Sequence, residues 1–254
     1  MKKLIQRIIR SFNKILFSKE MPKKIIIYFH ETTELEVKAL AKIIKYFRDL
    51  DYEFCNVKNL NLDNKNKQIA LTFDDAFLNW ENTLPIFREN NIKATFFLNT
   101  IQFSTDDKSK FLSDTKIGNH YELITKDVLV KITQDGHEIG SHTHSHRNLS
   151  NLNMVEFKDE IDKNLNILKD FNIYPSGFAI PFGMRRFVTN EQKDVLKKIF
   201  QYICMGEPGM LYEHTKEVFQ RYPWRIDLAF QENIDNLKID SSKFNNLTKR
   251  SGLG

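Results

Sequence analysis

The sequence predicts an α/β protein whose strands form a parallel sheet, either open or closed into a barrel. Short apolar runs rich in β-branched and aromatic residues alternate with longer segments whose apolar residues recur at helical spacing. This alternation is typical of folds in which a helix connects each strand to the next one. The chain has 254 residues, 41% of them hydrophobic, and is therefore long enough for one domain with a sizeable core.

The first elements of the chain show this alternation clearly. Residues 24–29 (KIIIYF) are almost wholly apolar, which suits a strand that is covered on both faces. Residues 34–50 place their apolar side chains on one stripe and predict a helix. Residues 52–57 and residues 68–73 (QIALTF) predict two further strands, separated by a polar loop.

The middle of the chain continues with a predicted helix over residues 80–91 and a predicted strand over residues 93–99 (KATFFLN). Residues 103–120 are polar and irregular and predict a long loop. A helix is expected over residues 125–134, because Thr125 is a suitable N-cap at its start.

Beyond residue 134 strands and helices continue to alternate. Short apolar runs predict strands at residues 137–140, 177–180, 202–205 and 226–228. Amphipathic segments between them predict helices at residues 154–171 and 189–200. About seven strands alternating with helices therefore make up the predicted sheet.

The N-terminal twenty residues differ from the rest of the chain. Their apolar residues recur at helical spacing, but Arg7, Arg10 and Lys14 interrupt the run, so it matches neither a cleavable signal peptide nor a transmembrane helix. Residues 1–20 therefore predict a basic amphipathic helix ahead of a main domain over residues 21–254. Such a helix either docks on its own domain or contacts a membrane surface peripherally, and the protein is expected in the cytoplasm or at a membrane face.

The charge and the cysteines exclude some classes of function. The formal charge of +5 is mild, and the sequence has no basic stripe with interleaved aromatic residues, so nucleic-acid binding is not predicted. Cys55 and Cys204 are expected to be free thiols in buried strands, because two distant cysteines provide neither a disulfide framework nor a structural zinc site.

Polar side chains follow three of the predicted strands at the point where each strand ends. These side chains are His30, Asp74, Asp75, His142 and His146. Because the carboxyl ends of parallel strands converge on one face of the fold, residues that are distant in the sequence are expected to become neighbours there.

The spacing of two of the histidines predicts ligands for a metal ion. His142 and His146 are expected to lie on one side of a helical turn, from which His144 points away. Two imidazoles and one carboxylate leave coordination positions open for water and a substrate oxygen. The adjacent aspartates indicate a division of labour in which one binds the metal and the other removes a proton. The expected cofactor is one divalent ion, zinc first, with cobalt, nickel or manganese as alternatives.

Three segments of the sequence resemble a known family of carbohydrate esterases. The segments IALTFDDAFLNWENTLPIFRENNIKATFFLNT, GHEIGSHTHSHRNLSNL and FAIPFG resemble the NodB-type polysaccharide deacetylases, and the resemblance covers residues 24–230. It implies a distorted parallel (β/α)7 barrel that hydrolyses acetyl groups from N-acetylated sugars in a polysaccharide or glycan precursor. It also implies that Asp74 is the general base and that Asp75, His142 and His146 hold the metal.

Two departures from the family pattern lie close to the expected base. Ala76 stands where a Gly usually follows the aspartates, which is a modest change if the backbone there stays in a region open to Ala. Ala179 stands where many members have an Arg that orients the base. Arg225 or Arg221 is expected to reach the same place from the next strand.

The expected general acid also differs from the usual pattern. Most members use a late His, but no His follows His214 in this chain. The chain resembles instead a subgroup with permuted strand order, similar to poly-N-acetylglucosamine deacetylases, in which a YH or FH at the end of the first strand supplies the acid. The match with IIIYFH implies that His30 protonates the departing amine, the alternative being a structural role beside Asp74.

The third segment implies that Pro181, Phe182 and Gly183 shape the substrate pocket, with Phe182 and Gly183 acting through their backbone. His137 is expected to be a core histidine. Two alternatives to a sugar deacetylase stay open. One is a glycan-binding or scaffold protein with impaired catalysis, motivated by Ala179, and the other is an amidohydrolase that acts on a non-carbohydrate amide.

Overall fold

Eight strands form one sheet in the computed structural model, which describes residues 23–61, 65–115, 122–206 and 226–227. The strands follow the order β7-β6-β5-β4-β3-β1-β8, and β2 pairs with β3 beside this path. Their bounds are β1 (Lys24–Phe29), β2 (Glu53–Cys55), β3 (Gln68–Asp74), β4 (Thr95–Leu98), β5 (Glu138–Ser141), β6 (Gly177–Ala179), β7 (Tyr202–Cys204) and β8 (Ile226–Asp227). All these pairings are parallel. The predicted parallel α/β barrel is therefore confirmed, as a half-barrel in the described residues.

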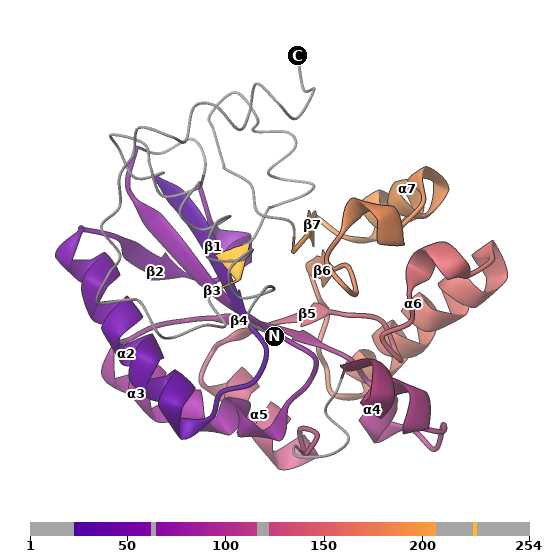
Figure 1. Cartoon of the computed structure of the whole chain (residues 1–254), viewed down its shortest axis with the longest axis horizontal. Coiled ribbons are helices and arrows are strands. Elements are labelled where there is room, and N and C mark those ends of the chain that lie inside the picture. The colour runs from indigo at the N-terminus through magenta and orange to yellow at the C-terminus, as the bar shows by residue number, and fades with distance from the viewer. Residues whose placement is uncertain (1–22, 62–64, 116–121, 207–225, 228–254) are drawn as a thin grey trace, which may run out of the picture.

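Helices cover the outside of this sheet. They are α2 (Glu34–Asp49), α3 (Leu84–Glu89), α4 (Ser109–Thr115), α5 (Lys126–Gln134), α6 (Met154–Asp170) and α7 (Asn190–Ile199). Figure 1 shows α2, α3 and α5 gathered beside the strands from the first half of the chain, and α6 and α7 beside β5 to β7. The sheet is therefore covered on its outer face along its length.

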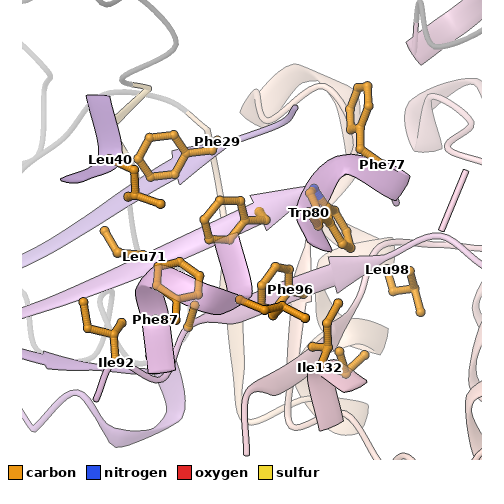
Figure 2. Packing of buried hydrophobic residues seen from close by; sticks show 14 of the residues in the cluster. Phe29, Leu40, Leu71, Phe77, Trp80, Phe87, Ile92, Phe96, Leu98 and Ile132 are labelled. Carbon is orange, nitrogen blue, oxygen red and sulfur yellow. The ribbon is translucent and has the colours of Figure 1, made fainter. Parts of the chain in front are cut away.

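The strand sequences are nearly continuous apolar runs because both faces of the strands are buried. Towards the helices, the Phe73 ring stacks between Phe29 and Phe96, with ring centroids 5.2 and 4.8 Å apart. Trp80 packs against Phe96 in the same cluster, as Figure 2 shows. On the other face, residues such as Ala70 form a second, smaller cluster. Each strand is thereby held from both sides, which fixes the positions of the residues at its end.

The register of the strands brings their carboxyl ends to one edge. β1 and β3 pair from Lys24↔Gln68 to Phe29↔Phe73, so the residues that follow each strand start at the same level. Asp74 then pairs with Phe97 of β4, and the neighbouring Leu98 pairs with Ser141 of β5. The predicted convergence of polar residues at this edge therefore follows directly from the pairing.

Two predicted elements differ from the structure. The predicted loop over residues 103–120 contains α4, because the buried Phe111 anchors a seven-residue helix that is too short to show apolar periodicity. The predicted helix over residues 80–91 is divided into the 3-10 helix η2 (Leu78–Thr83) and α3. Pro85 lies in the first turn of α3, where its missing N–H interrupts a continuous helix less than it would further along.

Other predictions are confirmed or fall on residues outside the described ranges. The Thr125 side chain caps α5 by accepting a hydrogen bond from the backbone N–H of Val128. The amphipathic helix predicted for residues 1–20 and the side chain of Arg225 lie outside the described residues. Within the ranges that the structure describes, no helix combines the length and hydropathy needed to cross a membrane.

Candidate active site

The polar residues predicted from the sequence meet at the carboxyl edge of the sheet. Asp74 is the last residue of β3, His30 follows β1 directly, and His142 follows β5. The two aspartates and the histidines of the HTHSH segment are buried, whereas the side chain of His30 is 38% exposed. The site therefore combines buried carboxylates and imidazoles with one histidine whose side chain solvent and ligands can reach.

Asp75 lies between two histidines. Its Oδ1 atom is 3.2 Å from Nε2 of His142 and 3.2 Å from Nε2 of His146. One ligand atom from each of the three residues lies within 4.8 Å of the other two. A carboxylate and two imidazoles at this spacing can hold a divalent cation. The structure therefore brings together the three residues that were expected to bind metal.

The hydrogen bond on the far side of His142 shows which nitrogen of its ring faces Asp75 when the ring is neutral. Nδ1 of His142 is 2.8 Å from the carbonyl oxygen of Ala179, which can only accept a hydrogen bond. Nδ1 therefore carries a proton, and in the neutral imidazole Nε2 presents its lone pair to the Asp75 carboxylate. Two buried lone pairs 3.2 Å apart need a positive charge between them, either a proton or a metal ion.

The local charges favour an ionised carboxylate. Burial by itself raises the pKa of Asp75, but the charge of His146 and the hydrogen bonds from His142 and His146 outweigh it and hold that pKa well below its usual range. Burial likewise lowers the pKa of His142, whereas the hydrogen bond with Asp75 and the charges of both aspartates raise it overall. The site therefore attracts positive charge.

The two histidines lie on a loop, and the prediction that they share a helical turn is wrong. Thr143 (φ 66°) and His146 (φ 57°) adopt left-handed backbone conformations, which a helix does not contain. The Thr143 hydroxyl accepts a hydrogen bond from the backbone N–H of His146 at 3.0 Å. The loop thereby turns both imidazoles towards Asp75, with their ring centroids 5.0 Å apart. His144 is bonded elsewhere, as predicted.

The turn after β3 is left-handed at two successive residues. The φ angles of Asp75 and Ala76 are 77° and 58°. This region costs a residue with a Cβ roughly 1–2 kcal/mol, because the Cβ crowds the following carbonyl oxygen. The condition that Ala76 should occupy a backbone region open to Ala is therefore not met. The chain keeps a strained turn, and this turn directs the carboxylate of Asp75 at the two histidines.

His30 approaches the site from β1. Its Nε2 lies 3.8 Å from Oδ2 of Asp75, whereas the two buried histidines face the other oxygen of this carboxylate. The indole N–H of Trp80 donates a hydrogen bond to the carbonyl oxygen of His30 at 2.7 Å. Trp80 lies in η2, which follows the turn that carries Asp75. A hydrogen bond therefore connects His30, the predicted acid, to η2, which follows the predicted ligand Asp75.

The loop after β6 lies beside the histidines. The Phe182 ring is 41% exposed, and its centroid is 4.6 Å from that of His146. Phe182 was expected to act through its backbone, and the structure shows in addition a contact of its ring with His146. Gly183 has a φ of 70°, and an added Cβ would lie 2.7 Å from Cα of Gly206, so only glycine fits there. Pro181 is buried at the start of this loop.

Two contacts of the site were missed in the sequence. Ala179 was considered only for the Arg that it replaces, yet its carbonyl oxygen orients His142. Trp80 was assigned to a predicted helix, and its bond to His30 was not foreseen. The sequence signal for this bond is a Trp close behind the aspartate pair. Arg225, the expected replacement for the missing Arg, lies outside the described residues.

A comparison with protein families identifies the domain. The model of the family described as polysaccharide deacetylase matches residues 61–199, which is more than half of the chain. This range includes Asp74, Asp75, His142 and His146, whereas His30 precedes it.

Two curated relatives agree with this match. The chain is 32% identical over 140 residues to a peptidoglycan-N-acetylglucosamine deacetylase of Bacillus cereus, across 54% of this chain and 43% of that protein. It is 36% identical over 99 residues to a chitin deacetylase of Arthroderma benhamiae, across 39% of this chain and 22% of the relative. The chain thus matches less than half the length of either relative.

Solved structures match over most of the chain. The deacetylase PplD of Streptococcus pyogenes, in complex with acetate, superposes with a TM-score of 0.63 at 18% identity over 84% of this chain and 95% of its own. IcaB from Ammonifex degensii superposes with a TM-score of 0.61 at 14% identity over 89% of this chain and 98% of its own. At these identities the matches establish the fold alone. Together with the family match, they show that this chain belongs to the polysaccharide deacetylase family.

Proposed function

We propose that the chain hydrolyses acetyl groups from N-acetylated sugars with the help of one divalent metal ion held by Asp75, His142 and His146. The observation that carries this proposal is the convergence of two imidazole Nε2 atoms on one buried carboxylate oxygen, at 3.2 Å each. When bound, such an ion lowers the pKa of a water molecule and polarises the acetyl carbonyl group. Zinc is the expected metal, with cobalt, nickel or manganese as alternatives.

Asp74 is the proposed general base. It is 3% exposed and ends β3 beside the proposed ligand Asp75, but it is not part of the three-residue cluster. In the proposed reaction the oxygen of a water molecule attacks the acetyl carbon, and the proton of that water passes to the Asp74 carboxylate.

His30 is the proposed general acid. As the bond between the acetyl carbon and the nitrogen breaks, His30 gives a proton to the nitrogen, so that acetate and a free amino sugar leave. Its partly exposed side chain, 3.8 Å from Asp75, supports this role because a leaving group that approaches from solvent can reach it. The role in bracing a carboxylate is the alternative that mutation must separate from acid catalysis.

The proposed substrate is a glycan that contains N-acetylglucosamine. The relatives named above are a deacetylase of peptidoglycan N-acetylglucosamine and a deacetylase of chitin. The exposed ring of Phe182 beside His146 offers an apolar face for a sugar ring or an acetyl methyl group. Membrane contact through residues 1–20 stays a prediction, because these residues lie outside the described ranges.

The proposal is tested by acetate release from a panel of substrates. The metal-loaded full-length chain and its Asp74→Asn variant are incubated with chitooligosaccharides, poly-N-acetylglucosamine, peptidoglycan and an N-acetyl-lysine peptide. We expect acetate from at least one glycan with the wild type and little from the variant. Release from the peptide alone would favour the amidohydrolase alternative. Metal binding with equally poor acetate release by the wild type and the variant from all substrates would favour the scaffold alternative.

A further inference from the structure

The three residues between the histidines of the proposed metal centre are each bonded to helix α6. The backbone N–H of His144 donates to the carbonyl oxygen of Glu160 at 3.1 Å. The backbone N–H and the hydroxyl of Ser145 donate to the two carboxylate oxygens of Glu160 at 2.8 and 2.5 Å. The side-chain amide of Asn164 donates to the carbonyl oxygen of Thr143 at 2.7 Å. One helix therefore fixes three consecutive residues of the loop.

Glu160 and Asn164 stand on the buried face of α6, although both are polar. They are four residues apart, one turn along the same face, and are 5% and 0% exposed. Burying polar side chains is unfavourable unless they are hydrogen-bonded. The amide of Asn164 also donates to the carbonyl oxygen of Leu98 at 2.9 Å, at the end of β4. These two side chains therefore link the loop to both the helix and the sheet.

The loop needs such support because its conformation is strained. Thr143 and His146 both have positive φ angles, of 66° and 57°. A left-handed backbone conformation is unfavourable for a residue with a side chain and persists only where the surroundings determine it. Without its bonds to α6, the loop would relax towards conformations that no longer direct both imidazoles at Asp75.

We propose that Glu160 and Asn164 are positioning residues that hold the loop of residues 142–146 in its metal-binding conformation before the metal binds. This inference rests on the proposed metal centre. Their bonds to the loop end on its backbone and on Ser145, so both residues act through the loop and not by coordinating the metal. Groups that orient metal ligands in this way typically change metal affinity roughly 10–100-fold when they are removed.

The test compares the affinity of variants for zinc. Zinc is titrated into the metal-free full-length chain in competition with a chromophoric chelator. We expect Glu160→Ala to weaken zinc binding roughly 10–100-fold. Glu160→Gln should remain close to the wild type, because its amide oxygen accepts from the Ser145 N–H while its amide nitrogen donates to the Ser145 hydroxyl. Ser145→Ala, which removes one of these bonds from a half-buried loop residue, should weaken binding less than Glu160→Ala.

A matched control separates positioning from general stability. Gln192 of α7 is 1% exposed, and its amide donates to the carbonyl oxygens of Leu149 and Leu152, so it fixes a neighbouring loop in a similar way. Gln192→Ala should lower the melting temperature while leaving the zinc affinity unchanged.

Three results would overturn the inference. Equal zinc affinity of Glu160→Ala and the wild type would do so, as would a parallel loss in Gln192→Ala. Where Glu160→Ala does not fold, unchanged zinc affinity of Ser145→Ala decides against it. A wild-type chain that binds no zinc overturns the proposed metal centre itself, which is a different and recognisable outcome.

Discussion

Replacing His30 by Gln separates acid catalysis from structural bracing. Gln keeps a polar group near the position of Nε2, and the bond from Trp80 to the carbonyl oxygen of residue 30 does not depend on the side chain. The ionic contact with Asp75 is long, at 3.8 Å, and His30 is 38% exposed, so its loss should change stability by about 1 kcal/mol or less. A general acid contributes roughly 10²–10⁴-fold to a rate, which is about 3–5 kcal/mol of the activation barrier. The catalytic effect should therefore far exceed the structural one.

The assay uses two substrates that differ in their leaving groups. An N-acetylglucosamine oligomer must release an amine that needs a proton, whereas 4-nitrophenyl acetate releases a phenolate that needs none. We expect His30→Gln to lower kcat roughly 10²–10⁴-fold on the oligomer and only slightly on the ester. Asp74→Asn should lower kcat on both, because the water must lose its proton in each case. Equal losses on both substrates in His30→Gln, or no loss on the oligomer, would refute the assignment of the acid.

Three further predictions concern stability and positioning. Burial lowers the pKa of His137 from 6.5 to about 4. The unfolded chain therefore takes up this proton first, and about 3 kcal/mol of stability that is present above pH 6.5 should be lost as the pH falls to 4. The His137→Asn variant keeps an acceptor for the Ala94 N–H. Its free energy of unfolding, measured in urea, should depend on pH less strongly than that of the wild type. Identical pH profiles of the two proteins would contradict this. Trp80→Phe removes the N–H that donates to the His30 carbonyl oxygen and should lower kcat up to about tenfold on the oligomer. In a His30→Gln background the same change should cause no further loss. Additive losses would show that Trp80 does not act through His30. Chelation of a metal present at 100 times its Kd should remove about 2.7 kcal/mol of stability, seen as a lower melting temperature that excess zinc restores; an unchanged melting temperature would argue against a bound metal.

The parts of the fold that the sequence predicted are those with strong local signals. β1 was predicted with the bounds that the structure gives, because KIIIYF is apolar on both faces of a covered strand. The N-cap at Thr125 was predicted because a Thr side chain at the start of a helix can accept a hydrogen bond from a backbone N–H of the first turn. In the structure this N–H belongs to Val128. α4 was missed because only two adjacent residues, the buried Phe111 and the partly buried Leu112, pack on the core, and they leave no periodic pattern. Local patterns therefore predicted elements that are long or capped, and not a short helix held by tertiary packing.

The residues that meet at the site were predicted better than the backbone geometry that brings them together. Residue type and position at strand ends were enough to predict that the aspartate pair meets His142 and His146, because parallel strands bring their carboxyl ends together. The choice of Asp75 as the metal ligand came from the family resemblance. The left-handed loop was mistaken for a helical turn, since a spacing of four residues fits both. The supporting Glu160 could not be linked to the loop from sequence, although a charged residue within the apolar stripe of a helix is a signal that a buried partner exists.

The most direct test of the central claim measures bound metal and acetate release in the same preparations of four proteins. These are the wild type, Asp74→Asn, Asp75→Ala and His142→Ala, each purified as the full-length chain and supplied with zinc. The proposed division of labour predicts one zinc per chain and no acetate for Asp74→Asn, because the base is lost while the ligands remain. It predicts neither tight zinc binding nor acetate for Asp75→Ala and His142→Ala. Full zinc occupancy with wild-type acetate release in either ligand variant would contradict the account.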